Sequence, residues 1–236
     1  MILDLDSPPK GTVREWLDHR AGEDGVAFIF TEDGTTLRWS ELRAEAGQVA
    51  SQLTMAGHAK GESIAILHPN GRAGVIAVYG ALYGGFRATM INLAAGRDAI
   101  AYALEHSDAR TAFVHESVAE IFAAARPASM TRFVAGAIPA AWVLHDITPK
   151  DHALLMYTSG TTGRPKGVVH THASLLAGGW TTTIAHGLRP EDRGLCVLPI
   201  YHINGLCVSL MGALVSGGSI AMAPRFSAGQ FWSDAG

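Results

Sequence analysis

Short apolar segments alternate with helical segments through the first half of the chain, and this alternation restricts the fold more than any other feature of the sequence. The apolar segments are Ser63–Leu67, Ala88–Ile91 and Thr111–His115. Helical patterns separate and follow them, over Ala73–Leu82, Asp98–Glu105 and Ser117–Ala125. The alternation predicts βαβ crossovers and therefore an α/β fold with mostly parallel sheets flanked by helices. Sheets of this kind place ligand sites at the carboxyl ends of their strands.

The segment before this alternation predicts a β-hairpin followed by a helix. Two β-rich runs, Val26–Thr31 and Thr35–Trp39, flank an Asp-Gly turn. Apolar residues then recur at helical spacing from Leu42 to Leu53, with Ser40 as a candidate N-cap and Gly57 as the expected stop.

A looser stretch with three prolines, residues 126–150, predicts a connection between two parts of the chain. We therefore expect a first α/β lobe over residues 1–125 and the start of a second α/β lobe over residues 151–236.

Composition excludes several classes of protein. With 48% apolar and 17% charged residues, the 236-residue chain can bury a sizeable core. Its net charge of −3 and the absence of Lys and Arg clusters argue against a nucleic-acid partner. Cys196 and Cys207 form no CxxC pair, and the charged N-terminal segment does not resemble a signal peptide, so we expect a cytoplasmic location.

One uncharged stretch, Gly194–Pro224, is long enough to cross a bilayer. However, Pro199, His202, Asn204 and the Gly217–Gly218 pair divide it into shorter pieces. We interpret it as a buried strand, helix and strand, and expect no membrane span.

A loop rich in Ser, Thr and Gly joins two expected strands, Ala153–Thr158 and Gly167–His172. Gly160 and Gly163 allow consecutive backbone N–H groups to turn inward as an anion-binding nest. The further donors are the hydroxyls of Thr158, Ser159, Thr161 and Thr162 and the ammonium group of Lys166. This set of donors predicts a cradle for a polyphosphate.

The loop does not match the known short phosphate-binding motifs. Counting five residues from Gly160 or Gly163 reaches Pro165 or Val168, so GxxxxGK[ST] is not satisfied, and GxGxxG does not occur. The alternative interpretation is a polar surface hairpin, because Ser, Thr and Gly are common turn residues.

Three segments together resemble the AMP-forming acyl-adenylating enzymes, a superfamily of acyl-CoA synthetases, luciferases and peptide-synthetase adenylation domains. "YTSGTTGRPKGVVHTH" (157–172) is similar to the phosphate-loop signature of this superfamily, and "VLPIYHINGL" (Val197–Leu206) to its aromatic-histidine motif. The segment from Thr35 to Gly71 resembles its early hairpin, helix and strand. The resemblance covers nearly the whole chain and is closest to acid–CoA ligases.

The resemblance implies a fold, a reaction and a set of ligands. The chain would be an incomplete part of the large N-terminal domain of such an enzyme. A carboxylic acid and ATP would give an acyl adenylate and pyrophosphate, and coenzyme A would then displace AMP. A carboxylate is already ionised at pH 7, so the first step requires alignment and charge neutralisation but no general base. ATP, Mg²⁺, coenzyme A and a small carboxylic acid are the implied ligands.

The resemblance also assigns residues. Thr158, Ser159, Gly160, Thr161, Thr162 and Gly163 would hold the β- and γ-phosphates, with Thr161 near the magnesium ion. Lys166 would reach the phosphates. His202 would stand at the junction of the acyl pocket and the thiol tunnel, beside Tyr201; the alternative is a structural histidine next to a turn.

His170 and His172 would share one face of a strand, as metal ligands do, but the sequence supplies no third ligand, and we expect no metal site on protein side chains.

The sequence lacks later segments of the superfamily, including the C-terminal swinging domain. We therefore expect the isolated chain to be inactive, and to self-associate or pair with the absent segment. The alternative hypothesis is a non-catalytic nucleotide-binding or partner-interaction module with the same fold.

Overall fold

The computed structural model describes residue 4 and residues 6–136, 141–158 and 165–235. The strands are β1 (Val26–Phe30), β2 (Thr36–Arg38), β3 (Ser63–Leu67), β4 (Arg87–Met90), β5 (Thr111–Val114), β6 (Thr131–Arg132), β7 (His152–Thr158), β8 (Lys166–Thr171), β9 (Arg193–Cys196) and β10 (Ser219–Met222). The helices are α1 (Val13–Ala21), α2 (Trp39–Met55), α3 (Arg72–Gly84), α4 (Arg97–His106), α5 (Ala119–Ala125), α6 (His172–His186), α7 (Gly212–Ser216) and α8 (Phe231–Ala235). A 3-10 helix, η1 (Glu116–Val118), precedes α5, and a π-helix, η2 (Asn204–Met211), precedes α7.

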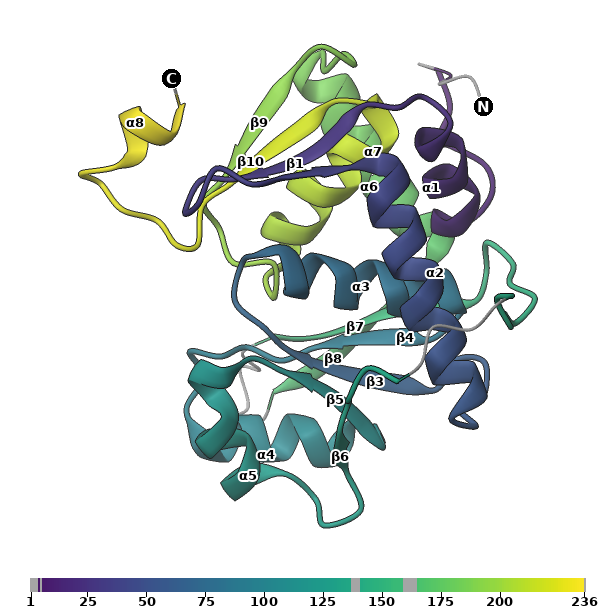
Figure 1. The fold of residues 1–236 in the computed structure, drawn as a ribbon, viewed down its shortest axis with the longest axis vertical. Helices are drawn as coiled ribbons and strands as arrows, with labels where there is room; N and C mark the ends of the chain where they lie inside the picture. Colours follow the sequence, from purple (N-terminus) through teal and green to yellow (C-terminus); the bar gives the residue numbers. More distant parts are fainter. Residues whose placement is uncertain (1–3, 5, 137–140, 159–164, 236) are drawn as a thin grey trace.

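The strands form two sheets, shown one above the other in Figure 1. The lower sheet, sheet B, has the order β6-β5-β3-β4-β7-β8. Its neighbours are parallel except for β7 and β8, which form an antiparallel hairpin. The upper sheet, sheet A, has the order β2-β1-β10-β9. This arrangement confirms the predicted α/β fold class.

Sheet A contains strands from the early and the late parts of the chain. The predicted hairpin forms, with β1 antiparallel to β2, and β1 also pairs in parallel with β10, so that Phe28 lies opposite Ile220. The strand, helix and strand expected over residues 194–224 are likewise present as β9, η2 with α7, and β10. Each sheet contains strands from both sides of residues 126–150. The expected lobe boundary therefore does not separate the two sheets.

Alternating side chains of sheet B enter two hydrophobic clusters. Ile64 and Ile66 of β3 face the larger cluster, which includes the apolar faces of α2 and α3, whereas Ala65 and Leu67 face a smaller one under α4 and α5. The larger cluster continues to sheet A. Covering both faces explains why β3 is apolar at nearly every position.

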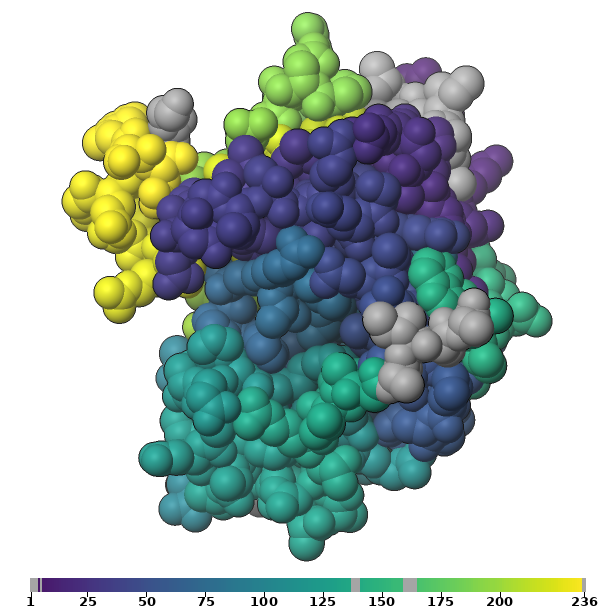
Figure 2. Space-filling model, viewed as in Figure 1, coloured from purple at the N-terminus to yellow at the C-terminus, as the bar shows by residue number. Residues whose placement is uncertain are grey.

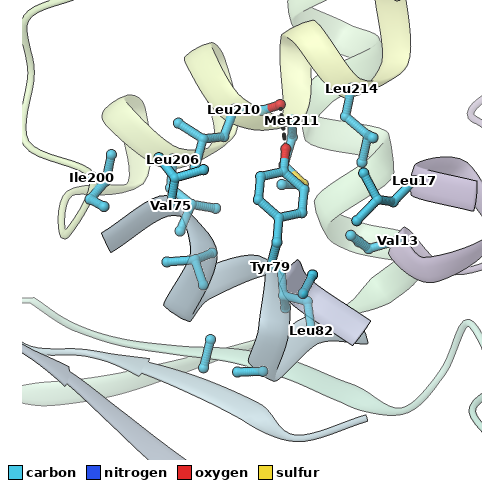
Figure 3. Close-up of a cluster of buried hydrophobic side chains, with 14 of the residues drawn as sticks. Val13, Leu17, Val75, Tyr79, Leu82, Ile200, Leu206, Leu210, Met211 and Leu214 are labelled. Carbon is cyan, nitrogen blue, oxygen red and sulfur yellow. Dashed lines mark hydrogen bonds between the residues drawn. The ribbon is translucent and has the colours of Figure 1, made fainter. Parts of the chain in front are cut away.

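Helix α3 lies between the sheets and contacts elements of both. Figure 3 shows Tyr79 of α3 directed at η2, where its hydroxyl donates to the carbonyl oxygen of Leu210 over 3.1 Å. Its side chain is fully buried, and burial raises the pKa of the Tyr79 phenol. Burying one large apolar side chain in such a core contributes roughly 1.5–3 kcal/mol.

Two local expectations differ from the structure. Helix α2 begins at Trp39 with Arg38 at the N-cap, whose N–H donates to the Glu41 carboxylate over 2.8 Å, so Ser40 is not the cap. The expected strand ending at His172 stops at Thr171, because the Thr171 hydroxyl accepts from the N–H of Ser174 and caps α6. The sequence did not predict α6.

The last helix, α8, stands apart from the rest of the chain, as the yellow atoms in Figure 2 show. Its Trp232 side chain is 81% exposed. No helix among the described residues is long and apolar enough to cross a membrane.

Candidate functional site

The two ends of the predicted phosphate loop lie opposite each other on the β7–β8 hairpin. Thr158 and Lys166 are the final pair in the register, and the Thr158 hydroxyl donates to the Lys166 carbonyl oxygen over 3.5 Å. Both side chains are exposed. Ser159, Gly160, Thr161, Thr162 and Gly163 lie outside the described residues, and their roles stay predictions.

The strand pairing of sheet B shows where the loop end of this hairpin lies relative to the other strands. Ile66, Met90 and Met156 occupy one level across β3, β4 and β7. Two residues further along each strand, His68, Asn92 and Thr158 therefore share the carboxyl edge of sheet B. Strands are about 4.8 Å apart, so Thr158 lies roughly 10 Å from the end of β3 along this edge. The carboxyl edge is where α/β sheets of this type bind ligands.

A hollow of about 550 Å³ borders the described end of the phosphate loop. Pro165, Tyr102 and the first turn of α4, including Arg97, form its walls. The described residues around the loop thus offer a hydroxyl, an ammonium group and a nearby guanidinium, which are donors that suit phosphate oxygens.

His202 follows the carboxyl end of β9 in sheet A. Its N–H donates to the Pro199 carbonyl oxygen over 3.0 Å, and its own carbonyl accepts from the N–H of Leu206 over 3.0 Å. The imidazole is exposed and lies 5.1 Å from the Tyr201 ring, measured between ring centroids. An exposed ring on a hydrogen-bonded turn can reach a ligand, so its position differs from that of a buried structural histidine.

The turn before η2 is tightly closed. A Cβ on Gly205 would lie 2.2 Å from the Pro199 carbonyl oxygen, which only glycine can avoid. Gly205 belongs to η2, and π-helices are rare and are frequently found at functional sites. We name the segment Val197–Ile203, which contains His202, the histidine segment.

A bridge between the two sheets brings the histidine segment to the edge that carries Thr158. Asn70, in the turn after β3, donates from Nδ2 to the Leu198 carbonyl oxygen over 3.1 Å and accepts at Oδ1 from the N–H of Ile200 over 2.9 Å. The histidine segment therefore lies against the carboxyl end of β3. The hairpin end with Thr158 and Lys166 and the histidine segment therefore lie along the same carboxyl edge of sheet B.

Sequence reasoning missed Asn70 and a second residue of this turn, His68. The His68 ring is buried and lies 5.5 Å from the ring of His115, centroid to centroid. Burial, with the nearby His115 and Arg132, lowers the pKa of His68 to about 4, so the ring is neutral at pH 7. Their place directly after a buried strand is the signal that could have identified both residues.

His170 and His172 do not form a pair. His170 is half-buried on β8, and burial lowers its pKa. His172 begins α6, is fully buried, and accepts at Nδ1 from the N–H of Val13 over 3.4 Å. Within the described parts of the chain, no group of three His, Cys, Asp or Glu residues could hold a metal ion.

A second hollow, of about 200 Å³, lies near the amino ends of β9 and β10. Asp192, Ser219 and Val208 are among the residues that form its walls. Because His202 follows the carboxyl end of β9, this hollow lies at the opposite end of the strand and is not part of the candidate site.

Comparison with known proteins assigns the arrangement to a family. A family model described as "AMP-binding enzyme" matches residues 15–235. Among curated proteins, the chain is 38% identical over 225 residues to a sulfoacetate–CoA ligase of Cupriavidus necator, covering 89% of this chain and 44% of that protein. It is 31% identical over 216 residues to a 2-succinylbenzoate–CoA ligase of Bacillus licheniformis, covering 90% of this chain and 45% of that protein.

Solved structures agree with the fold. The N-terminal domain of FACL13 from Mycobacterium tuberculosis superposes with a TM-score of 0.86 at 26% identity, covering 96% of this chain and 60% of that structure. The o-succinylbenzoate CoA synthetase of Bacillus subtilis, in complex with an acyl-adenylate intermediate, gives a TM-score of 0.81 at 26% identity, covering 93% of this chain and 58% of that structure. The chain spans less than half the length of these curated relatives.

Proposed function

The chain belongs to the AMP-binding enzyme family, and from that membership we propose that these residues form the N-terminal part of an ATP-dependent carboxylic acid–CoA ligase. The observation that supports this most directly is that the Thr158–Lys166 hairpin end and the histidine segment lie along the same carboxyl edge of sheet B, at the ends of β7 and β3. One part suits a polyphosphate and the other suits a carboxylic acid. A ligase that activates an acid with ATP requires both.

The proposed reaction has two steps. A carboxylate oxygen attacks the α-phosphorus of ATP, and the bond from that phosphorus to pyrophosphate breaks. The sulfur of coenzyme A then attacks the acyl carbon, and the bond from that carbon to the AMP oxygen breaks, giving a thioester and AMP. Neither step requires a redox reagent.

In this proposal the phosphate loop acts through position and charge. Thr158 and the residues up to Gly163 donate hydrogen bonds to the β- and γ-phosphates, and Lys166 neutralises part of their charge. Mg²⁺, when bound with ATP, supplies further charge neutralisation. Thr161 would lie near the ion.

His202 orients the acid. An imidazole N–H donates to the substrate carboxylate, at the junction of the acyl pocket and the path of the incoming thiol. Relatives act on sulfoacetate and 2-succinylbenzoate, by their names, and we propose a small carboxylic acid as the substrate class here. We propose a cytoplasmic location, which suits two free cysteines.

Carboxylate-dependent exchange of pyrophosphate into ATP tests the proposal. The enzyme that contains these residues should catalyse the exchange with a small carboxylic acid, whereas the 236 residues alone should stay near background. Absence of exchange across a panel of small acids would favour the non-catalytic module, provided that ATP still binds.

The proposal includes self-association of the isolated chain or its pairing with a further segment. Leu198 and Ile203 of the histidine segment and Val208 of η2 are 49%, 39% and 44% exposed. In the described part of the fold, β9 pairs with β10 alone. Sedimentation velocity should show concentration-dependent association, and a concentration-independent monomer would contradict it.

A further inference from the structure

Asn70 makes a three-way connection between the two sheets. Besides its bonds to Leu198 and Ile200, its Nδ2 donates to the carbonyl oxygen of Ala223 over 3.0 Å. The residue is only 7% exposed. The opposite orientation of the amide would direct its oxygen at two carbonyls and its NH₂ at an N–H group, so only this orientation satisfies all three partners. The carboxyl end of β3 is thereby joined to the segments that follow β9 and β10.

The two bonds to the histidine segment lie on either side of Pro199. The Pro199 carbonyl in turn accepts the N–H of His202, so the backbone that carries the imidazole is fixed through its neighbours. The Ile200 side chain is fully buried and reaches the start of α3, where a Cβ on Gly74 would lie 3.1 Å from its Cδ1. The base of the histidine segment is therefore held by sheet B, while the His202 ring remains exposed.

We infer that Asn70 is a positioning residue that sets the place of His202 relative to Thr158 at the end of β7. Asn70 and Thr158 belong to the same carboxyl edge of sheet B, so its hydrogen bonds define the separation between the acid-binding and phosphate-binding parts of the site. The inference rests on the proposed function of His202. Asn70 itself contacts backbone atoms of three residues and is not a catalytic residue.

Asn70→Asp tests the donor role at nearly constant shape. The carboxylate can accept from Ile200 but directs negative charge at the two carbonyls to which Asn70 donates. In the enzyme containing these residues, we expect KM for the acid to rise several-fold, up to about the tenfold expected for complete loss of one hydrogen bond to the carboxylate, with KM for ATP within about twofold of the parent. If the Asp variant does not fold, Asn70→Ser, which keeps one hydroxyl donor, should give a smaller rise in the same parameter.

Tyr79→Phe is the matched control. It also removes one buried hydrogen bond between α3 and the η2 region, at Leu210, beyond the histidine segment. We expect it to lower the melting temperature as the Asn70 variants do, but to leave KM for the acid unchanged. An equal rise in KM for Tyr79→Phe would show that the Asn70 effect is general destabilisation and would overturn the inference.

Histidine side-chain NMR supplies a readout that does not depend on activity. The ring signals of His202, identified by their loss in His202→Gln, should move in Asn70→Asp or Asn70→Ser and stay in place in Tyr79→Phe. If they stay in place in the Asn70 variants, the positioning role is wrong. If they move while KM for the acid does not change, the positioning role stands and the proposed role of His202 in acid binding fails.

Discussion

Sheets A and B each carry one half of the candidate site, but the chain builds them differently. Five of the strands of sheet B follow one another within residues 63–158, with short crossovers between most of them. Sheet A instead pairs β1 with β10, from opposite ends of the chain. Pairing residues so far apart costs more loop-closure entropy and is expected to be slower. The phosphate loop belongs to the locally built sheet, and the histidine segment to the sheet built from distant segments.

The difference extends to how each part of the site is held. Backbone pairing of β7 with β8 is enough to bring Thr158 and Lys166 together. The histidine segment instead depends on Asn70, which comes from the other sheet. Substitutions in the phosphate loop should therefore change nucleotide handling without changing stability, whereas substitutions of Asn70, which supports the histidine segment, should change both acid binding and stability.

The largest effect should come from Gly160→Val. A β-branched side chain disfavours positive φ and blocks close approach of a phosphate to the backbone, so we expect adenylation to fall by at least about 100-fold. The melting temperature of the nucleotide-free protein should change little. ATP titration by calorimetry beside thermal melts measures both quantities.

Gly34→Val is the control for this substitution. Gly34 lies in the β1–β2 turn at φ +72 with open space around its Cα, so valine there strains a turn of sheet A without approaching the site. It should lower the melting temperature and leave ATP binding intact. A Gly160→Val protein that binds ATP as the parent does would contradict the phosphate-cradle interpretation.

The same contrast explains how much of the structure the sequence predicts. β3, β4, β5 and the helices between them were predicted to within about two residues, because period and turn signals are local. Nothing local indicates that Phe28 pairs opposite Ile220. Helix α6 was missed because Gly178, Gly179 and a run of threonines weaken its helical signal.

The residues of the candidate site also differ in how far the sequence predicts them. The hydroxyls, glycines and lysine of the phosphate loop are adjacent in the sequence, so their chemistry can be recognised from the sequence. Asn70 lies far from Leu198 and Ala223 in the sequence, and an Asn before a Gly predicts only a turn. Its bridging role follows from the packing of sheet A over α3, which the sequence does not specify locally.

Acid should destabilise the contact between α6 and α1. His172 connects α6 to α1, and burial lowers its pKa to about 4 from 6.5. Between these two values the unfolded chain binds a proton that the folded chain does not, so stability is highest above pH 6.5 and falls as the pH approaches 4. The cost at pH 4 is on the order of 3 kcal/mol for this one group.

Chemical denaturation from pH 7 to pH 4 measures this loss. In His172→Gln the slope of unfolding free energy against pH should fall by about 1.4 kcal/mol per pH unit, the value for one proton. His68 titrates in the same window and is present in both proteins, so it cancels in the difference. Equal slopes would mean that His172 does not remain neutral in the fold.

Lys166→Ala should have an intermediate effect confined to the nucleotide. Its exposed side chain contributes a point charge to the phosphates, and its loss should weaken ATP binding by about 1.5–3 kcal/mol, the scale of a charge-assisted hydrogen bond. Since Lys166 pairs with Thr158 through backbone atoms, alanine preserves the hairpin. Lys150→Ala, away from the hairpin end, is the charge-matched control. Equal ATP affinities for the two variants would show that Lys166 does not contact the phosphates of ATP.

The smallest effect should come from His202→Ala, and it should distinguish the two parts of the site. Loss of one hydrogen bond to a substrate carboxylate corresponds to about 1.5 kcal/mol, or roughly a tenfold rise in KM for the acid. ATP affinity should stay at the parent value, because the imidazole belongs to the histidine segment and not to the phosphate loop. The melting temperature should also stay close to that of the parent, since the ring is exposed and its turn is held by backbone bonds and by Asn70.

His152→Ala replaces an exposed histidine at the amino end of β7 and controls for loss of a surface imidazole. It should leave the binding of both ATP and the acid unaffected. If His202→Ala instead weakens ATP and spares the acid, the assignment of nucleotide chemistry to sheet B and acid chemistry to sheet A is wrong.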